Sequence, residues 1–141
     1  MNNSFERDVI IISFYTHIIE NLLKEHGKLS IFKTIVFSFL IKKQEVSSKI
    51  YNSNNKNDVM LKFLSQLSGE FSNFVKDLDF LFKSIDILVK SNKIEYINNG
   101  VLRIKDFEVI YKSNNDLLYK AIKESNHYSD EQFMKEVLYY V

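Results

Sequence analysis

The sequence predicts a mainly α-helical fold with a small β component, and three observations support this prediction. The 141 residues include no proline and only three glycines, so residues that interrupt helices are scarce. Between Phe71 and Val89, apolar residues recur at intervals of three and four, the period of one helix face. Residues 94–97 and 101–104 then flank Asn99-Gly100, which suits the positive φ angles of a tight hairpin turn. A helix followed by a short β-hairpin ends a winged-helix module. The predicted fold class is therefore mainly α (α+β), a helical domain with a winged-helix-like C-terminal β-hairpin.

The composition predicts one globular domain over residues 1–141. Hydrophobic residues make up 45% of the chain, with twelve Phe and eight Tyr, which is ample for a core and argues against disorder. The formal net charge is +1, so no strong overall field attracts the chain to nucleic acid or to a membrane surface. A DNA-binding role would therefore need a local basic patch.

Two helices are expected in the first third of the chain. Residues 4–26 form the first, with Ser4 as its N-cap and Gly27 placed to end it. Residues 30–43 form the second, with Ser30 as the candidate cap. Residues 44–57 are rich in Ser and Asn and are expected to form a loop.

The remaining helices are short, apart from the one over residues 71–89. Asn57 or Asp58 caps a helix that ends or bends near Gly69. Residues 107–111 fit a third strand or a helical turn equally well. Asn115 and Asp116 open a short helix, and a capping box, in which Gln132 follows Ser129 by three residues, opens the last. On the helix over residues 71–89 we expect four side chains in the core: Phe74, Leu78, Ile85 and Leu88.

No motif for catalysis, cofactor binding or metal binding is present, so we predict a protein that is not an enzyme. The absence of cysteine excludes disulfides, thiolate metal sites and a Cys nucleophile. His17 and His26 lack the i, i+3 or i, i+4 spacing of helical metal ligands. Asp77, Asp79 and Asp86 could in principle do acid–base chemistry. They are better read as a solvated helix edge, where Lys76, Lys83 and Lys90 alternate with them.

Two surfaces are candidates for contact with partners. On the hairpin, a wing could touch phosphates through Lys93, Tyr96, Arg103 and Lys105. The alternative is an ordinary solvated hairpin balanced by Glu95 and Asp106. A protein interface is expected from apolar residues that fall beside the main stripe or at the chain end: Phe80, Phe82, Ile87, Tyr139 and Tyr140.

The chain also resembles a known family over residues 5–104. The resemblance rests on the order of three segments and the hairpin after them: Phe14-Tyr15-Thr16-His17-Ile18-Ile19, residues 29–40, and residues 81–92. This order resembles the middle component of bacterial ABC-type three-component conflict systems, the group that includes the small subunit of Lamassu-like defence. The resemblance implies a helical protein with a winged-helix-like end and no catalytic residues. It also implies protein partners, namely a structural-maintenance-type ATPase and an effector, often a nuclease.

Two functions remain open at this point. The first is a non-catalytic accessory or scaffold subunit of a bacterial anti-phage or anti-plasmid defence complex. The alternative is a free-standing winged-helix transcriptional regulator that binds DNA. A third possible function, a small enzyme or toxin, is disfavoured because the sequence contains no recognisable set of reactive residues. We expect a cytoplasmic protein without a membrane partner, because no apolar run approaches the roughly 20 residues of a membrane span. We also expect that it can form homo-oligomers and that it touches DNA weakly or indirectly, if at all.

Overall fold

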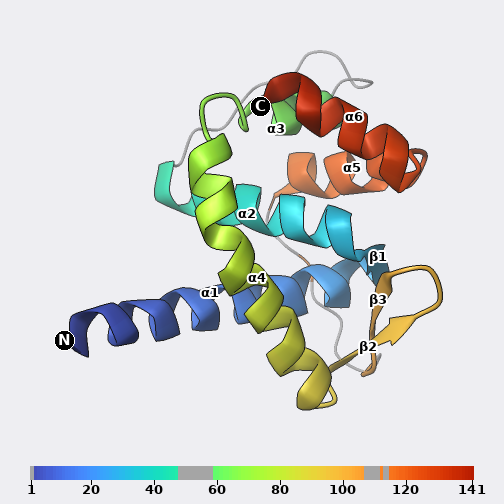
Figure 1. The fold of residues 1–141 in the computed structure, drawn as a ribbon. Helices are drawn as coiled ribbons and strands as arrows, with labels where there is room; N and C mark the ends of the chain where they lie inside the picture. The colour runs from blue at the N-terminus through green and yellow to red at the C-terminus, as the bar shows by residue number, and fades with distance from the viewer. Residues whose placement is uncertain (1, 48–58, 107–111, 113–114) are drawn as a thin grey trace.

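The computed structural model describes residues 2–47, 59–106, 112 and 115–141, and these comprise six helices and three strands (Figure 1). In chain order they are α1 (Asn2–His26), β1 (Lys28–Ser30), α2 (Ile31–Ser47), α3 (Val59–Ser65), α4 (Phe71–Lys90), β2 (Ile94–Ile97), β3 (Val101–Ile104), α5 (Asp116–Ser125) and α6 (Asp130–Tyr140). The mainly helical fold and the hairpin are thus confirmed.

The three strands form one antiparallel sheet in the order β1-β3-β2. Leu102 at the centre of β3 pairs with Leu29 of β1 on one side and Tyr96 of β2 on the other. Asn99 and Gly100 in the hairpin turn have φ angles of 68° and 71°, as the sequence predicts. The element order α1-β1-α2-α4-β2-β3 is that of a winged helix with α3 inserted. The hairpin closes this unit rather than the chain, since α5 and α6 follow it.

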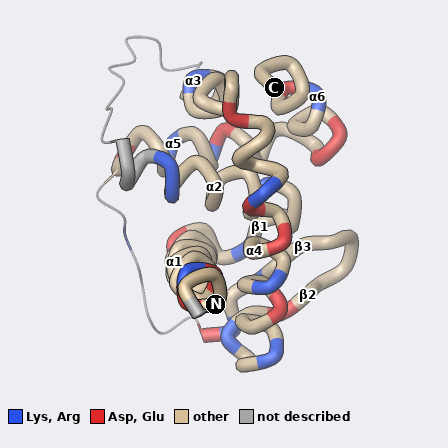
Figure 2. Tube along the Cα trace, turned by 60° about the vertical axis from the view of Figure 1, so that its left-hand side comes forward, with Lys and Arg blue, Asp and Glu red and all other residues tan. Residues whose placement is uncertain are grey.

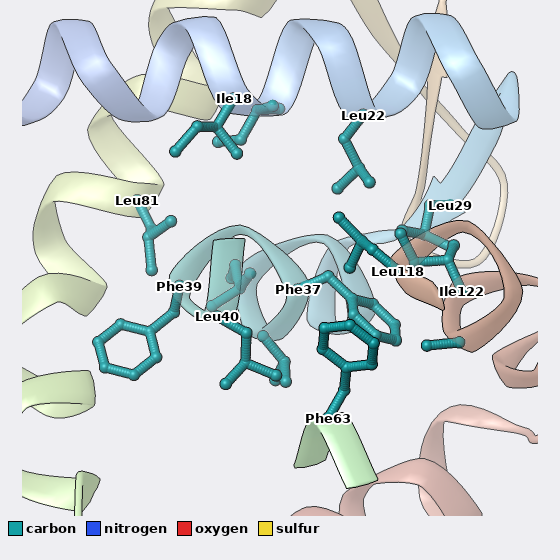
Figure 3. Close-up of a cluster of buried hydrophobic side chains, with 14 of the residues drawn as sticks. Ile18, Leu22, Leu29, Phe37, Phe39, Leu40, Phe63, Leu81, Leu118 and Ile122 are labelled. Atoms are coloured by element: carbon teal, nitrogen blue, oxygen red, sulfur yellow. The ribbon is translucent and has the colours of Figure 1, made fainter. Parts of the chain in front are cut away.

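Helix α2 forms the centre of the molecule. Every residue from Lys33 to Leu40 is buried, as expected for a helix that is covered on all sides. Helix α1 lies on one side of α2 and helices α5 and α6 on the other, with α3 packed on α5 and α6, while α4 crosses both α1 and α2 (Figure 1). The core around α2 therefore draws residues from nearly every element, and Figure 3 shows part of it: Ile18, Leu22, Leu29, Phe37, Phe39, Leu40, Phe63, Leu81, Leu118 and Ile122.

The ends of the first two helices differ in part from the prediction. Helix α1 begins at Asn2, so Ser4 lies within the helix and does not cap it. Gly27, with a φ of 82°, ends α1 as expected. The Ser30 hydroxyl accepts a hydrogen bond from the Lys33 amide at 3.2 Å, which confirms the cap of α2. Helix α2 continues to Ser47, because no glycine or proline stops it after residue 43.

The caps of the last two helices are confirmed. The Asn115 side chain accepts a hydrogen bond from the Leu118 amide at 3.0 Å. The Ser129 hydroxyl accepts from the Gln132 amide at 3.1 Å, while the Ser129 amide donates to the Gln132 side chain at 3.0 Å, completing the capping box. The predicted caps at Asn57 and Asp58, the rest of the predicted loop (residues 48–57) and the segment 107–111 lie outside the described residues.

Helix α4 is amphipathic, but its buried side is narrower than its sequence suggests. Phe74, Ile85 and Leu88 are buried, as expected. Leu78 is half-buried against the core, and Phe71 and Val75 are exposed although they follow the apolar period. Helix α4 packs mainly on α1, and one helix neighbour covers only part of a wide apolar face.

Candidate interaction surface

The N-terminal part of α1 is apolar on several sides and exposed. Helix α4 crosses α1 near Ile12, whose carbonyl oxygen accepts a hydrogen bond from the Ser84 hydroxyl at 3.1 Å. Before this crossing, α1 extends away from the other helices (Figure 1). Phe5 is 71% exposed and Ile10 66%, and Val9 and Phe14 are also exposed. A wide apolar helix surface is normally buried by its neighbours, but within the described chain these four side chains remain exposed.

A shallow groove runs between α1 and α4 beside this projecting segment. It is lined by Val9, Ile12, Ser13, Thr16 and Ile87. The Thr16 hydroxyl donates to the Ile12 carbonyl at 2.7 Å, so its polar group is satisfied within α1. The groove therefore presents a mostly apolar surface, to which α1 contributes Val9 and Ile12 beside the smaller Ser13 and Thr16.

A second apolar strip lies on the other flank of α4. Phe71, Val75 and Phe82 are exposed and share one side of the helix by their spacing. Ile87 lies on the opposite flank, in the groove. Helix α4 is therefore apolar on both edges of its buried face.

The predicted interface residues are placed in different surroundings. Phe82 and Ile87 are exposed, at 53% and 47%, and Tyr139 is 80% exposed at the chain end. Phe80 and Tyr140 are half-buried and pack against the core. The exposed residues of α1, which the sequence pattern did not single out, add to this set. Their signal was the run Val9-Ile10-Ile11-Ile12, which covers more of a helix circumference than one neighbour can bury.

The hairpin cations that could touch DNA have partners within the protein. Arg103 pairs with Glu95, its direct neighbour across the two strands, and this hydrogen bond holds the pKa of Glu95 below its usual range. Lys93 lies 3.5 Å from Glu20 of α1, and Lys105 lies 3.4 Å from the Asn92 side chain. Tyr96, the remaining predicted contact, is exposed on β2.

The solvent side of α4 carries both signs of charge. Asp79 pairs with Lys83, and Asp86 with Lys90, each at 2.8 Å and four residues apart. Figure 2 shows acidic and basic residues interspersed along this helix and around the hairpin. In a DNA-reading winged helix, the corresponding helix enters the major groove and lies close to phosphates. Exposed carboxylates on α4 oppose that approach.

Asp77 differs from the other two acidic residues of α4, and its prediction as part of a solvated edge is wrong. Its carboxylate is largely buried where α1, α2 and α4 meet. It accepts hydrogen bonds from the Tyr15 hydroxyl and from the Lys42 ammonium, the latter at 2.9 Å. Burial, together with the nearby Asp77, raises the pKa of Tyr15. The sequence feature that indicates burial of Asp77 is its spacing: it lies three residues after Phe74 and four before Leu81, on the buried side of the helix.

The described residues contain no group of three or more His, Asp or Glu side chains placed to hold a metal ion. Across the same residues, no helix is both long and apolar enough to cross a membrane. Fold and surface together define a winged-helix-like helical protein with exposed apolar helix faces. Comparison with protein-family models, with curated proteins and with solved structures found no match to this chain.

Proposed function

We propose that this protein is a non-catalytic accessory subunit that binds protein partners through the projecting part of α1 and the adjoining faces of α4. The single observation that supports the proposal best is the exposed apolar segment of α1, with Phe5, Val9, Ile10 and Phe14. Clustered exposed apolar side chains typically mark interfaces. A winged-helix unit supplies a rigid base for such a surface.

The resemblance to the middle component of three-component conflict systems indicates which kinds of protein the partners would be. A structural-maintenance-type ATPase and an effector nuclease would bind this subunit in a bacterial anti-phage or anti-plasmid complex in the cytoplasm. The two apolar flanks of α4 and the projecting α1 offer room for two partners. In this role the subunit sets the distance and orientation between them and performs no reaction itself.

The rival function is a winged-helix regulator that binds DNA, and the element order of the fold is the observation in its favour. Against it stand the ion pair of Arg103 with Glu95 and the acidic residues on the solvent side of α4. Arg103 already has a carboxylate partner, and the carboxylates of Asp79 and Asp86 would repel phosphates that approach α4.

Sedimentation of the purified chain, alone and with the products of neighbouring genes, tests the proposal. We expect a stable complex that Ile10→Glu disrupts, because the new charge would have to be buried at the contact. Ser68→Glu, at an exposed position between α3 and α4, adds the same charge elsewhere and should leave the complex intact. A monomer that binds none of these products would contradict the proposal.

A further inference from the structure

His26, the last residue of α1, is buried against α5. Its side chain is 3% exposed, and its ring stacks on Tyr119 with centroids 5.1 Å apart and planes at 26°. Neither ring nitrogen makes a well-formed hydrogen bond in the described part of the chain, and the nearest acceptor, Glu25 Oε1, lies 3.4 Å from Nε2. A buried imidazole is favoured in its neutral form when charging it costs more hydration than the groups around it replace.

The charged and titratable groups that face this ring from the described elements act in opposite directions. On α1, Glu25 Oε1 lies 3.4 Å from His26 Nε2 and favours a protonated ring. On α5, the Lys123 ammonium lies 5.4 Å from the centre of the Tyr119 ring and disfavours protonation of His26. Burial is the largest influence, and the net effect is a pKa of His26 below its ordinary value.

The opposite end of α5 is held by separate contacts. The buried Lys33 ammonium of α2 donates to the carbonyl oxygens of Ser125 and Tyr128, at 2.7 and 2.6 Å. The Glu124 carboxylate accepts from the Met60 amide of α3 at 3.0 Å. The C-terminal end of α5 is thus anchored to α2 and α3. In the first turns of α5, Leu118 packs in the core and Tyr119 stacks on His26 of α1.

We infer that protonation of His26 loosens the first turns of α5 from the end of α1, while Lys33 keeps the other end of α5 in place. The contact between His26 and Tyr119 is then a pH-sensitive joint between the winged-helix unit and the two C-terminal helices. In the folded state the imidazolium ring has, among the described residues, only the Glu25 carboxylate beside it, and it gains the hydration that it lacks when the stacked contact with Tyr119 opens. This regulation is independent of which partner the protein binds.

The stability of the protein should fall as the solution is acidified from about pH 7.5 to about pH 5.5, the range in which histidine titrates. With the folded pKa of His26 below the unfolded one, the unfolded chain binds more protons over this range, so unfolding becomes easier. Each pH unit by which the His26 pKa differs between the folded and the unfolded chain changes the folding equilibrium constant by up to about tenfold. The lowered pKa values of Glu20, Glu70 and Glu95 act in more acidic solution.

The first experiment compares urea unfolding midpoints at these two pH values. The midpoint of the wild-type chain should fall on acidification. His26→Phe, which keeps an aromatic ring against Tyr119 but cannot be protonated, should abolish most of that fall. His17→Gln and His127→Gln, at exposed positions, should retain it. An equal fall in wild type and His26→Phe, or no fall in wild type, would overturn the inference.

The second experiment needs no substitution of His26. An NMR titration should give His26 a pKa below the ordinary value of histidine. Lys123→Gln should raise the pKa of His26 and Glu25→Gln should lower it further. At about pH 5.5, hydrogen exchange corrected for intrinsic rates should be faster over residues 116–120 and unchanged over 125–128. A His26 pKa at or above its ordinary value, or faster exchange of both segments together, would overturn the inference.

Discussion

Asp77 occupies a position on the buried side of α4, between Phe74 and Leu81. Its carboxylate joins three helices because Tyr15 donates to it from α1 and Lys42 donates from α2. A carboxylate in such a place lowers the free energy of the folded state only while both donors remain with it, since each would otherwise be a poorly hydrated polar group. The three side chains therefore act as a unit.

Replacing Asp77 by Asn should reduce the free energy of unfolding by about 1–3 kcal/mol, because the charge-assisted bonds to Tyr15 and Lys42 are lost or weakened. Asp79→Asn and Asp86→Asn are matched controls on the same helix. Their ion pairs are largely exposed, and each should change stability by less than about 1 kcal/mol. Urea denaturation of the three variants provides the measurement. Equal effects at all three positions would show that the contacts of Asp77 add nothing.

At the scale of elements, α4 combines a buried face that stabilises the fold with two apolar edges that do not. Leu88 lies fully within the core, whereas Phe82, on the same helix, is exposed. This division separates the residues that hold α4 on α1 and α2 from those available to a partner. The two roles can be distinguished by substitution.

Leu88→Ala should cost about 2–5 kcal/mol of unfolding free energy, because it leaves a cavity in a fully buried site. Phe82→Ala should change stability by roughly 0.5 kcal/mol or less, as is usual for a surface position. For the affinity of the protein for a partner, the ranking of the two variants should be the opposite: Phe82→Ala should weaken binding more than Leu88→Ala does. Calorimetry on the free protein and on the complex tests both statements. A large stability loss in Phe82→Ala alone would place its ring within the fold.

The sequence predicts elements whose signal is local and misses those that depend on distant residues. Helix α4 and the β2–β3 hairpin follow from apolar period and from Asn99-Gly100. Strand β1 was missed because three residues carry no pattern of their own, and they become a strand only by pairing with β3. The burial of Lys33 was missed because its partners, the carbonyl groups at the end of α5, are remote in sequence.

At the scale of the whole molecule, the near-neutral charge governs the response to DNA. The chain has 19 Lys and Arg against 18 Asp and Glu, and the two kinds intermingle on α4. Proteins that bind DNA tightly concentrate positive charge on one face. The hairpin presents little unbalanced positive charge, because Arg103 and Lys93 each lie beside a glutamate.

We therefore expect weak binding of the isolated protein to duplex DNA, with a dissociation constant in the range of about 10⁻⁴ to 10⁻⁶ M that is typical of non-specific contact. Fluorescence anisotropy over a series of salt concentrations measures both the affinity and its salt dependence. Glu95→Gln, which frees Arg103, should strengthen binding slightly. Tight, sequence-selective binding that Arg103→Ala or Lys105→Ala abolishes would instead establish the regulator function.

The position of β3 between β1 and β2 also sets the order in which the chain can fold. Strand β1 is synthesised early, yet its only strand partner in the described chain comes after the whole of α2, α3 and α4. Closing so long a loop is slow and entropically costly. Both strand pairings of the sheet involve β3, so neither can form until residues 101–104 have left the ribosome. During synthesis, Leu29 and the part of α1 that packs on β3 therefore stay uncovered until β3 emerges, and this is the stage at which chaperones would bind.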